Sequence, residues 1–199
     1  MPTPVANSGI VARAFELLEL RPISSVADDD DLARAAGATL IEARQLVLSL
    51  DDWAAVIARA PLMAQAGGGA ALTALDALYP MPSDCLVPRE VTTADGWRVT
   101  WQQEGRSIRA DAASDLVLRY TADTDREADL PAYLRQVVAL QMAVLMCDRQ
   151  VTSTAKKQAL IQQLDLARAE ARRADARTAS SRRYDGRDEP GDWVAEAVL

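Results

Sequence analysis

Apolar residues recur at helical intervals through most of the chain, and the first such segment covers residues 10–18. Asn7 or Ser8 can act as its N-cap, because a short polar side chain can accept a hydrogen bond from the first turn. Arg21-Pro22 can end it, because the residue before a proline is pushed out of the helical region. The pattern therefore predicts a short helix near the start of the chain.

A second helical segment starts at the acidic run of residues 28–31 and keeps helical spacing up to Leu50. We expect it to continue or restart as far as Ala60, with Pro61 as its end. A metal site is another interpretation of the acidic run, but no spaced acidic loop with its glycine follows, and a helix start with a solvated face fits better. The glycines of residues 67–69 lack the lysine of a phosphate loop and are typical of a flexible joint.

The spacing changes between residues 85 and 121, where short runs contain β-branched and aromatic residues. Asp95-Gly96 and Glu104-Gly105 separate these runs as turns. We expect a small antiparallel sheet of three or four strands inserted among the helices. Alternation places three side chains on one face of the sheet, which either packs against the helices or is exposed as a stacking platform for nucleic acid. Few basic residues flank this segment, so we favour packing against the helices. The residues of that face are Trp97, Val99 and Trp101.

The stretch from residue 129 to residue 183 organises the rest of the chain. Pro131 suits the first turn of a helix, and residues 137–147 are apolar almost without interruption, as in a helix surrounded by protein. A long helix then begins near Thr152 or Ser153. Its apolar stripe has a coiled-coil period and ends in small residues, so we expect this helix to be held weakly by its own chain. The stripe is Leu160, Leu164, Ala167, Ala171 and Ala174.

Together these patterns predict a mainly α fold: a helical bundle with a small inserted antiparallel β-sheet, a long C-terminal helix and an extended tail. We expect residues 1–184 to form one helical body with its β-insertion at about 85–121. Residues 185–199 contain glycine, proline and five acids, a composition typical of a flexible arm. The arm ends in apolar residues, and it can serve as an anchor that becomes ordered on a partner or fold back on its own body.

Composition limits the classes of function. The chain has 199 residues, 49% of them hydrophobic and 26% charged, with a net charge of −7, which argues against general affinity for DNA or an anionic membrane. It has no histidine, so zinc sites of the Cys/His type are excluded, and its two cysteines, Cys85 and Cys147, are too few for a disulfide scaffold. We expect no signal peptide and no membrane span.

No arrangement of residues predicts catalysis. Without histidine a nucleophile and base of the usual kind cannot be built, and the paired carboxylates cluster at turns instead of in apolar surroundings. Cys147 belongs to the apolar helix, where thiols are usually inert. We therefore expect no enzyme activity and no cofactor.

Basic residues gather on the last helix. They can grip phosphates, or they can form a solvated face that meets acidic groups of another subunit, because acids alternate with them. The second interpretation is the preferred one. The basic residues are Arg168, Arg172, Arg173, Arg177, Arg182 and Arg183.

In their order along the chain, these features resemble the head-to-tail connector, or adaptor, proteins of tailed bacteriophages and gene transfer agents. The matching segments are Arg21-Pro22-Ile23, Trp53 with Ala58-Arg59-Ala60 and Leu62, the run YPMPSDCL at residues 79–86, Leu118-Arg119-Tyr120, and Asp129-Leu130-Pro131 before the apolar helix.

The resemblance implies a structural protein without catalysis, located at the head-tail junction of a virion or phage-like particle and made in the bacterial cytoplasm. Such proteins form a ring, commonly of twelve subunits, between the portal protein and a tail-side stopper or tail terminator, and double-stranded DNA passes through the lumen. Their C-terminal arms commonly engage the portal. The residues expected to contact the portal or a neighbouring subunit are the six arginines with Tyr184, Trp193, Val194, Val198 and Leu199. The alternative is a helical nucleic-acid-binding or regulatory protein that uses the Arg-rich helix at residues 168–183.

Overall fold

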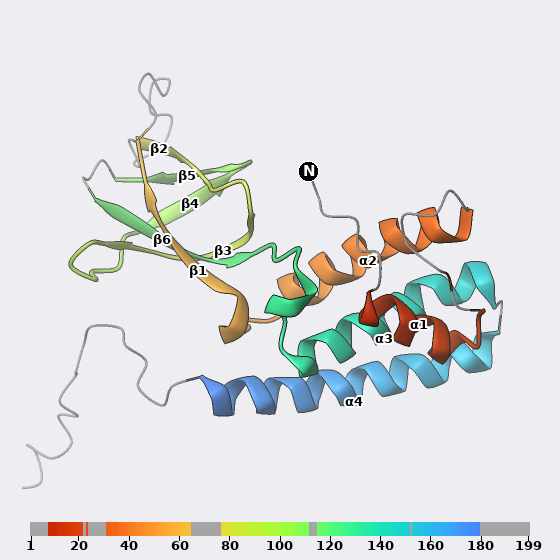
Figure 1. Cartoon of the computed structure of the whole chain (residues 1–199). Helices are drawn as coiled ribbons and strands as arrows, with labels where there is room; N and C mark the ends of the chain where they lie inside the picture. Colours follow the sequence, from red (N-terminus) through yellow and green to blue (C-terminus); the bar gives the residue numbers. More distant parts are fainter. Residues whose placement is uncertain are drawn as a thin grey trace, which may run out of the picture.

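The chain folds into a helical part and a β part that lie side by side (Figure 1). The computed structural model describes residues 8–21, 23, 31–64, 77–111, 115–151 and 153–179. The joint expected at residues 67–69 and the arm expected at residues 185–199 lie outside these ranges, as does most of the acidic run at residues 28–31.

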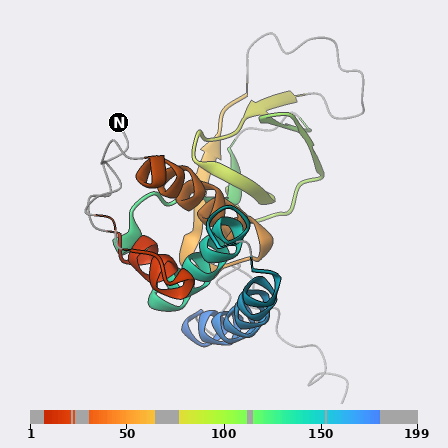
Figure 2. The ribbon, with the colours of Figure 1, turned by 90° about the vertical axis from the view of Figure 1, so that its right-hand side faces the viewer.

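One helix is the centre of the helical part. Helix α3 packs against the other three helices, and Figure 2 shows it between them. Nine of its residues are buried, on nearly every side of the helix. The prediction that residues 137–147 form a helix surrounded by protein is confirmed, because such an apolar surface is stable only inside a core. The four helices are α1 (Gly9–Leu18), α2 (Asp31–Leu50), α3 (Ala132–Gln150) and α4 (Thr154–Thr178).

The start of α1 is set by the Ser8 cap, as expected from the sequence, whereas its end at Leu18 comes before the expected stop at Arg21-Pro22. The Ser8 hydroxyl accepts a hydrogen bond from the amide of Val11 at 3.2 Å and donates one to the Glu127 carboxylate at 2.7 Å. Glu127 belongs to the short 3-10 helix η2 (Glu127–Asp129), so this cap also ties α1 to the segment that leads into α3. At the other end, Glu19 adopts a left-handed conformation (φ 58°) and stops the helix before Arg21-Pro22.

The β part contains two three-stranded antiparallel sheets in place of one. In the first, the strand order is β1-β6-β3, and in the second it is β2-β5-β4. The expected turns are present: Gly96 and Gly105 have positive φ, and Gly105 lies in the two-residue loop that joins the paired residues Glu104 and Ser107. The strands are β1 (Ile57–Leu62), β2 (Ala77–Pro80), β3 (Cys85–Thr93), β4 (Trp101–Glu104), β5 (Ser107–Ala110) and β6 (Leu116–Ala122).

The two sheets share a core that is separate from the helical one. Its buried residues come from both sheets, including Leu62 of β1, Tyr79 of β2 and Ile108 of β5. Val99 and Trp101 pack at the edge of this β core, whereas the Trp97 side chain is 61% exposed. The expectation that these residues pack against the helices was wrong, because Val99 and Trp101 pack against the core between the two sheets and Trp97 is largely exposed.

The mainly α fold class was also wrong. In the described residues 54% are helical and 24% lie in strands, so the protein is α+β. Part of the error lies at β1: residues 57–60 were expected to extend the second helix, with Pro61 as its end, and they form a strand instead. Alanines at Ala58 and Ala60 hid the alternation that turns one side of β1 towards the β core. Pairing with β6 along six residues decides the conformation, and the sequence of β1 alone does not reveal it.

Charged groups join the two parts. Arg89 of β3 donates to the backbone oxygen of Asp51 at 2.6 Å, just after α2, and to the Thr121 hydroxyl of β6 at 2.9 Å. Arg44 of α2 forms an ion pair of 2.9 Å with Asp123, which follows β6. The end of α2 is therefore held against the first sheet, and the turn after it has a defined position.

Candidate interaction site

The second half of α4 lies against the turn that follows α2. This turn contains Trp53 and the 3-10 helix η1 (Ala54–Val56). The Trp53 side chain is buried, and its indole N–H donates to the backbone oxygen of Val47 at 2.9 Å. This contact folds the chain back on α2 and brings Asp51 and η1 to face α4.

Two arginines of α4 bind the carboxylate of Asp51. Arg168 donates to one oxygen at 2.7 Å, and Arg172 lies 2.8 Å from the other. Residues four apart lie on one side of a helix, which allows both to reach the same acid. Burial by itself would raise the pKa of Asp51, but hydrogen bonds and charge attraction from the two guanidinium groups outweigh it, so the pKa lies below its usual value.

Asp175 makes a second contact, one turn after Arg172. Its side chain is buried and accepts hydrogen bonds from the amide of Ala54 and from the hydroxyl of Tyr133 on α3, both at 2.8 Å. Burial and this hydrogen bond to Asp175 together raise the pKa of Tyr133. A buried carboxylate is costly without partners, so these contacts fix the end of α4 in one position.

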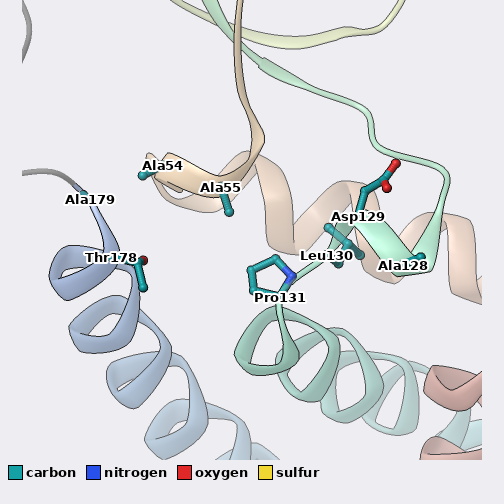
Figure 3. A pocket seen from close by; sticks show the side chains of 8 residues that line it. All are labelled: Ala54, Ala55, Ala128, Asp129, Leu130, Pro131, Thr178 and Ala179. Carbon is teal, nitrogen blue, oxygen red and sulfur yellow. The ribbon is translucent and has the colours of Figure 1, made fainter.

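A cavity of about 440 Å³ opens between the end of α4, η1 and the segment leading into α3 (Figure 3). Ala179, the residue after α4, is part of its wall. Carbon atoms dominate the lining, which suits an apolar occupant. The residues that line it are Ala54, Ala55, Ala128, Asp129, Leu130, Pro131, Thr178 and Ala179.

Another face of α4 is exposed, and its residues Leu166 and Glu170 border a groove that includes Leu17 of α1. Leu166, Glu170, Arg173 and Arg177 follow one another at intervals of four, three and four residues, so they form one stripe along the helix. The Leu166 side chain is 68% exposed. We call these four residues the outer stripe.

The structure divides the arginines expected at a contact surface into two groups. Arg168 and Arg172 form ion pairs with Asp51, with the Arg172 side chain still 54% exposed, whereas Arg173 and Arg177 belong to the outer stripe. The other expected residues lie outside the described ranges: Arg182, Arg183, Tyr184, Trp193, Val194, Val198 and Leu199.

Sequence reasoning missed Asp51, Asp175 and Tyr133. Asp51 was interpreted as part of a continuing helix and Asp175 as one of the acids interleaved with arginines. The one available signal is that Asp175 falls four residues after Ala171 on the apolar stripe of α4, where a charged residue needs a partner.

In the part of the chain that the structure describes, no group of three or more cysteine, aspartate or glutamate residues is placed to hold a metal ion. Within the same ranges, every helix is too short or too polar to cross a membrane. The end of α4 therefore combines a fixed helix end, a cavity and an exposed stripe. The chain matches no protein-family model, and no curated protein sequence is significantly similar to it.

Proposed function

We propose that the protein is a subunit of a head-tail connector ring, which joins the portal of a phage or gene transfer agent to the tail. The order of sequence features supports this proposal, as described above. The observation that carries it is the fixed second half of α4: Asp51 and Asp175 hold it to the body, while the outer stripe faces solvent.

A ring subunit needs a rigid surface for its neighbour and an arm that starts from a fixed point. The outer stripe meets the first need, because it combines an exposed leucine with charges on a helix that cannot swing freely. Ala179 meets the second, because it follows directly on a helix end held by Asp175. In the proposed assembly the stripe contacts a neighbouring subunit and residues 180–199 reach the portal.

The test is assembly with a portal protein, to be sought among the neighbouring genes, and it is measured by co-purification and by electron microscopy of the product. We expect rings at the portal, and we expect Arg173→Glu with Arg177→Glu to reduce their yield on the order of tenfold, as for central interface residues. Glu42→Lys is the matched control, because it reverses a charge on an exposed position of α2. No complex with the portal, or equal yields for both variants, would contradict the proposal.

DNA binding through the Arg-rich helix is the second candidate, favoured by the exposure of Arg173 and Arg177 on one face. The ion pairs of Arg168 and Arg172 with Asp51 reduce the positive charge available to phosphates. A gel-shift titration of the isolated chain decides between the two. Tight, salt-sensitive binding at physiological salt that Arg173→Ala and Arg177→Ala abolish would favour the second candidate.

A further inference from the structure

We infer that the cavity at the end of α4 is a docking site for the chain's own apolar segment at residues 193–199. This inference goes beyond the proposed ring, because it concerns the protein before any partner is bound. Two observations support it: the apolar lining of the cavity and its short distance along the chain from Trp193.

The lining suits an apolar side chain. Ala54, Ala55 and Ala128 are small, so they leave space without filling it, and Leu130 and Pro131 add apolar wall (Figure 3). The volume of about 440 Å³ lies in the range of roughly 300–1,000 Å³ that is typical of small-ligand sites. One tryptophan ring buries about 150–250 Å², more than any aliphatic residue, and is the natural occupant of such a space.

The same chain carries this occupant close to the cavity. Ala179 lines the cavity, and Trp193 follows it 14 positions later in the sequence. For a segment of that length, random-coil statistics give an end-to-end distance of about 20 Å, which is short enough for the Trp193 indole to reach the cavity. Tethering at this length gives an effective concentration in the millimolar range, well above that of another copy at micromolar protein.

Charge does not add to the apolar fit. The residues before Trp193 include the acids Asp188, Glu189 and Asp192. The cavity wall contains an acid of its own, Asp129, whose carboxylate lies 3.6 Å from Arg126. The inference therefore depends on the apolar lining and on the length of chain between Ala179 and Trp193.

The experiment compares single variants of the full chain by hydrogen-deuterium exchange. We expect Trp193→Ala to increase exchange around residues 54–56 and 126–131, and Ala55→Glu to increase exchange in residues 188–199. Ala55 is exposed, so the added carboxylate repels the acidic segment without disturbing the core. Ala38→Glu, at an exposed position of α2, and Arg187→Gln are the matched controls and should change neither region. Thermal unfolding checks that all four variants are folded.

A competition measurement completes the test. A synthetic peptide of residues 188–199 should bind the Trp193→Ala chain about tenfold or more tightly than the unaltered chain, whose cavity is already occupied. Equal binding to both chains, or exchange that neither variant changes, would overturn the inference. Protection that disappears on dilution would also overturn it, because the occupant would then be another copy. None of these readouts involves the portal, so failure of the proposed ring is observed separately.

Discussion

The two halves of α4 are attached to the same body in different ways. The first half packs through leucines, with Leu160 buried in the helical core and Leu164 partly buried beside it. Its ion pairs, of Lys156 with Glu19 and Lys157 with Asp148, involve carboxylates that are largely exposed. The second half packs through Ala167 and Ala171, which remove little apolar surface from water, and it is held in addition by the polar contacts of Arg168, Arg172 and Asp175. The small side chains of the second half bury less apolar area, and hydrogen bonds and ion pairs compensate for the stabilisation that this smaller area does not provide.

This difference separates stability from position. Apolar burial is not directional, so the leucines of the first half stabilise the bundle without specifying one orientation of the helix. Hydrogen bonds are directional, and those of Asp175 and Asp51 fix the position of the end of α4 against the rest of the protein. The polar contacts of the second half therefore fix the position of the cavity and of Ala179, the residue from which the chain continues.

The largest expected effect is that of Leu160→Ala, which leaves a cavity in the helical core. We expect the free energy of unfolding to fall by about 3 kcal/mol, measured by chemical denaturation. Leu166→Ala is the matched control on the exposed side of the same helix and should change it by less than about 0.5 kcal/mol. Similar losses for both variants would show that the first half of α4 is not held by its buried stripe.

A smaller and more local effect is expected for Asp175→Ala. The amide of Ala54 and the hydroxyl of Tyr133 lose their acceptor, which costs about 2 kcal/mol. Hydrogen-deuterium exchange should increase in the last turns of α4 and in η1, and much less around Leu160. Asp165→Ala changes an exposed acid of the same helix and should have no such effect. Faster exchange along the whole helix would mean that its two halves behave as one unit.

The smallest effect is that of Asp51→Asn, about 1 kcal/mol at neutral pH, because the ion pairs are partly open to water. The pKa of Asp51 is lower in the folded chain than in the unfolded one, so its stabilising contribution is present above the unfolded value of about 3.9. That contribution is lost as the pH falls through the folded pKa. Denaturation curves of the two chains should therefore converge in acid, whereas a constant difference down to pH 2 would contradict this origin. Asp165→Asn is the control.

The helical part could be predicted further than the β part. The buried helix α3 and the Ser8 cap follow from the sequence, because each depends on groups within a few residues. In the β part only the turns at Gly96 and Gly105 follow in the same way. Strand β1 could not be predicted in this way. Its alanines are compatible with a helix, and its partner β6 is more than fifty residues away along the chain, as the pairing of Ile57 with Thr121 shows.

In the candidate site, too, local features could be predicted from the sequence and long-range contacts could not. The arginines of α4 and the exposure of part of that helix are visible in the sequence. The direction of each arginine is not, because it depends on Asp51, which lies 117 positions before Arg168. A charge pattern indicates which residues can meet a partner, but the position of opposite charges in the folded chain decides which of them are already occupied.

By itself, the sequence determined the apolar helix at the centre, the capping and turn positions, and the period of the last helix. These features depend on local sterics and on how a helix distributes its side chains. The tertiary structure alone decided the α+β class, the second sheet, the ion pairs of Arg168 and Arg172 with Asp51, and the cavity at Ala179. Each of these needs segments that are distant in sequence to meet, and such contacts depend on how the whole core packs.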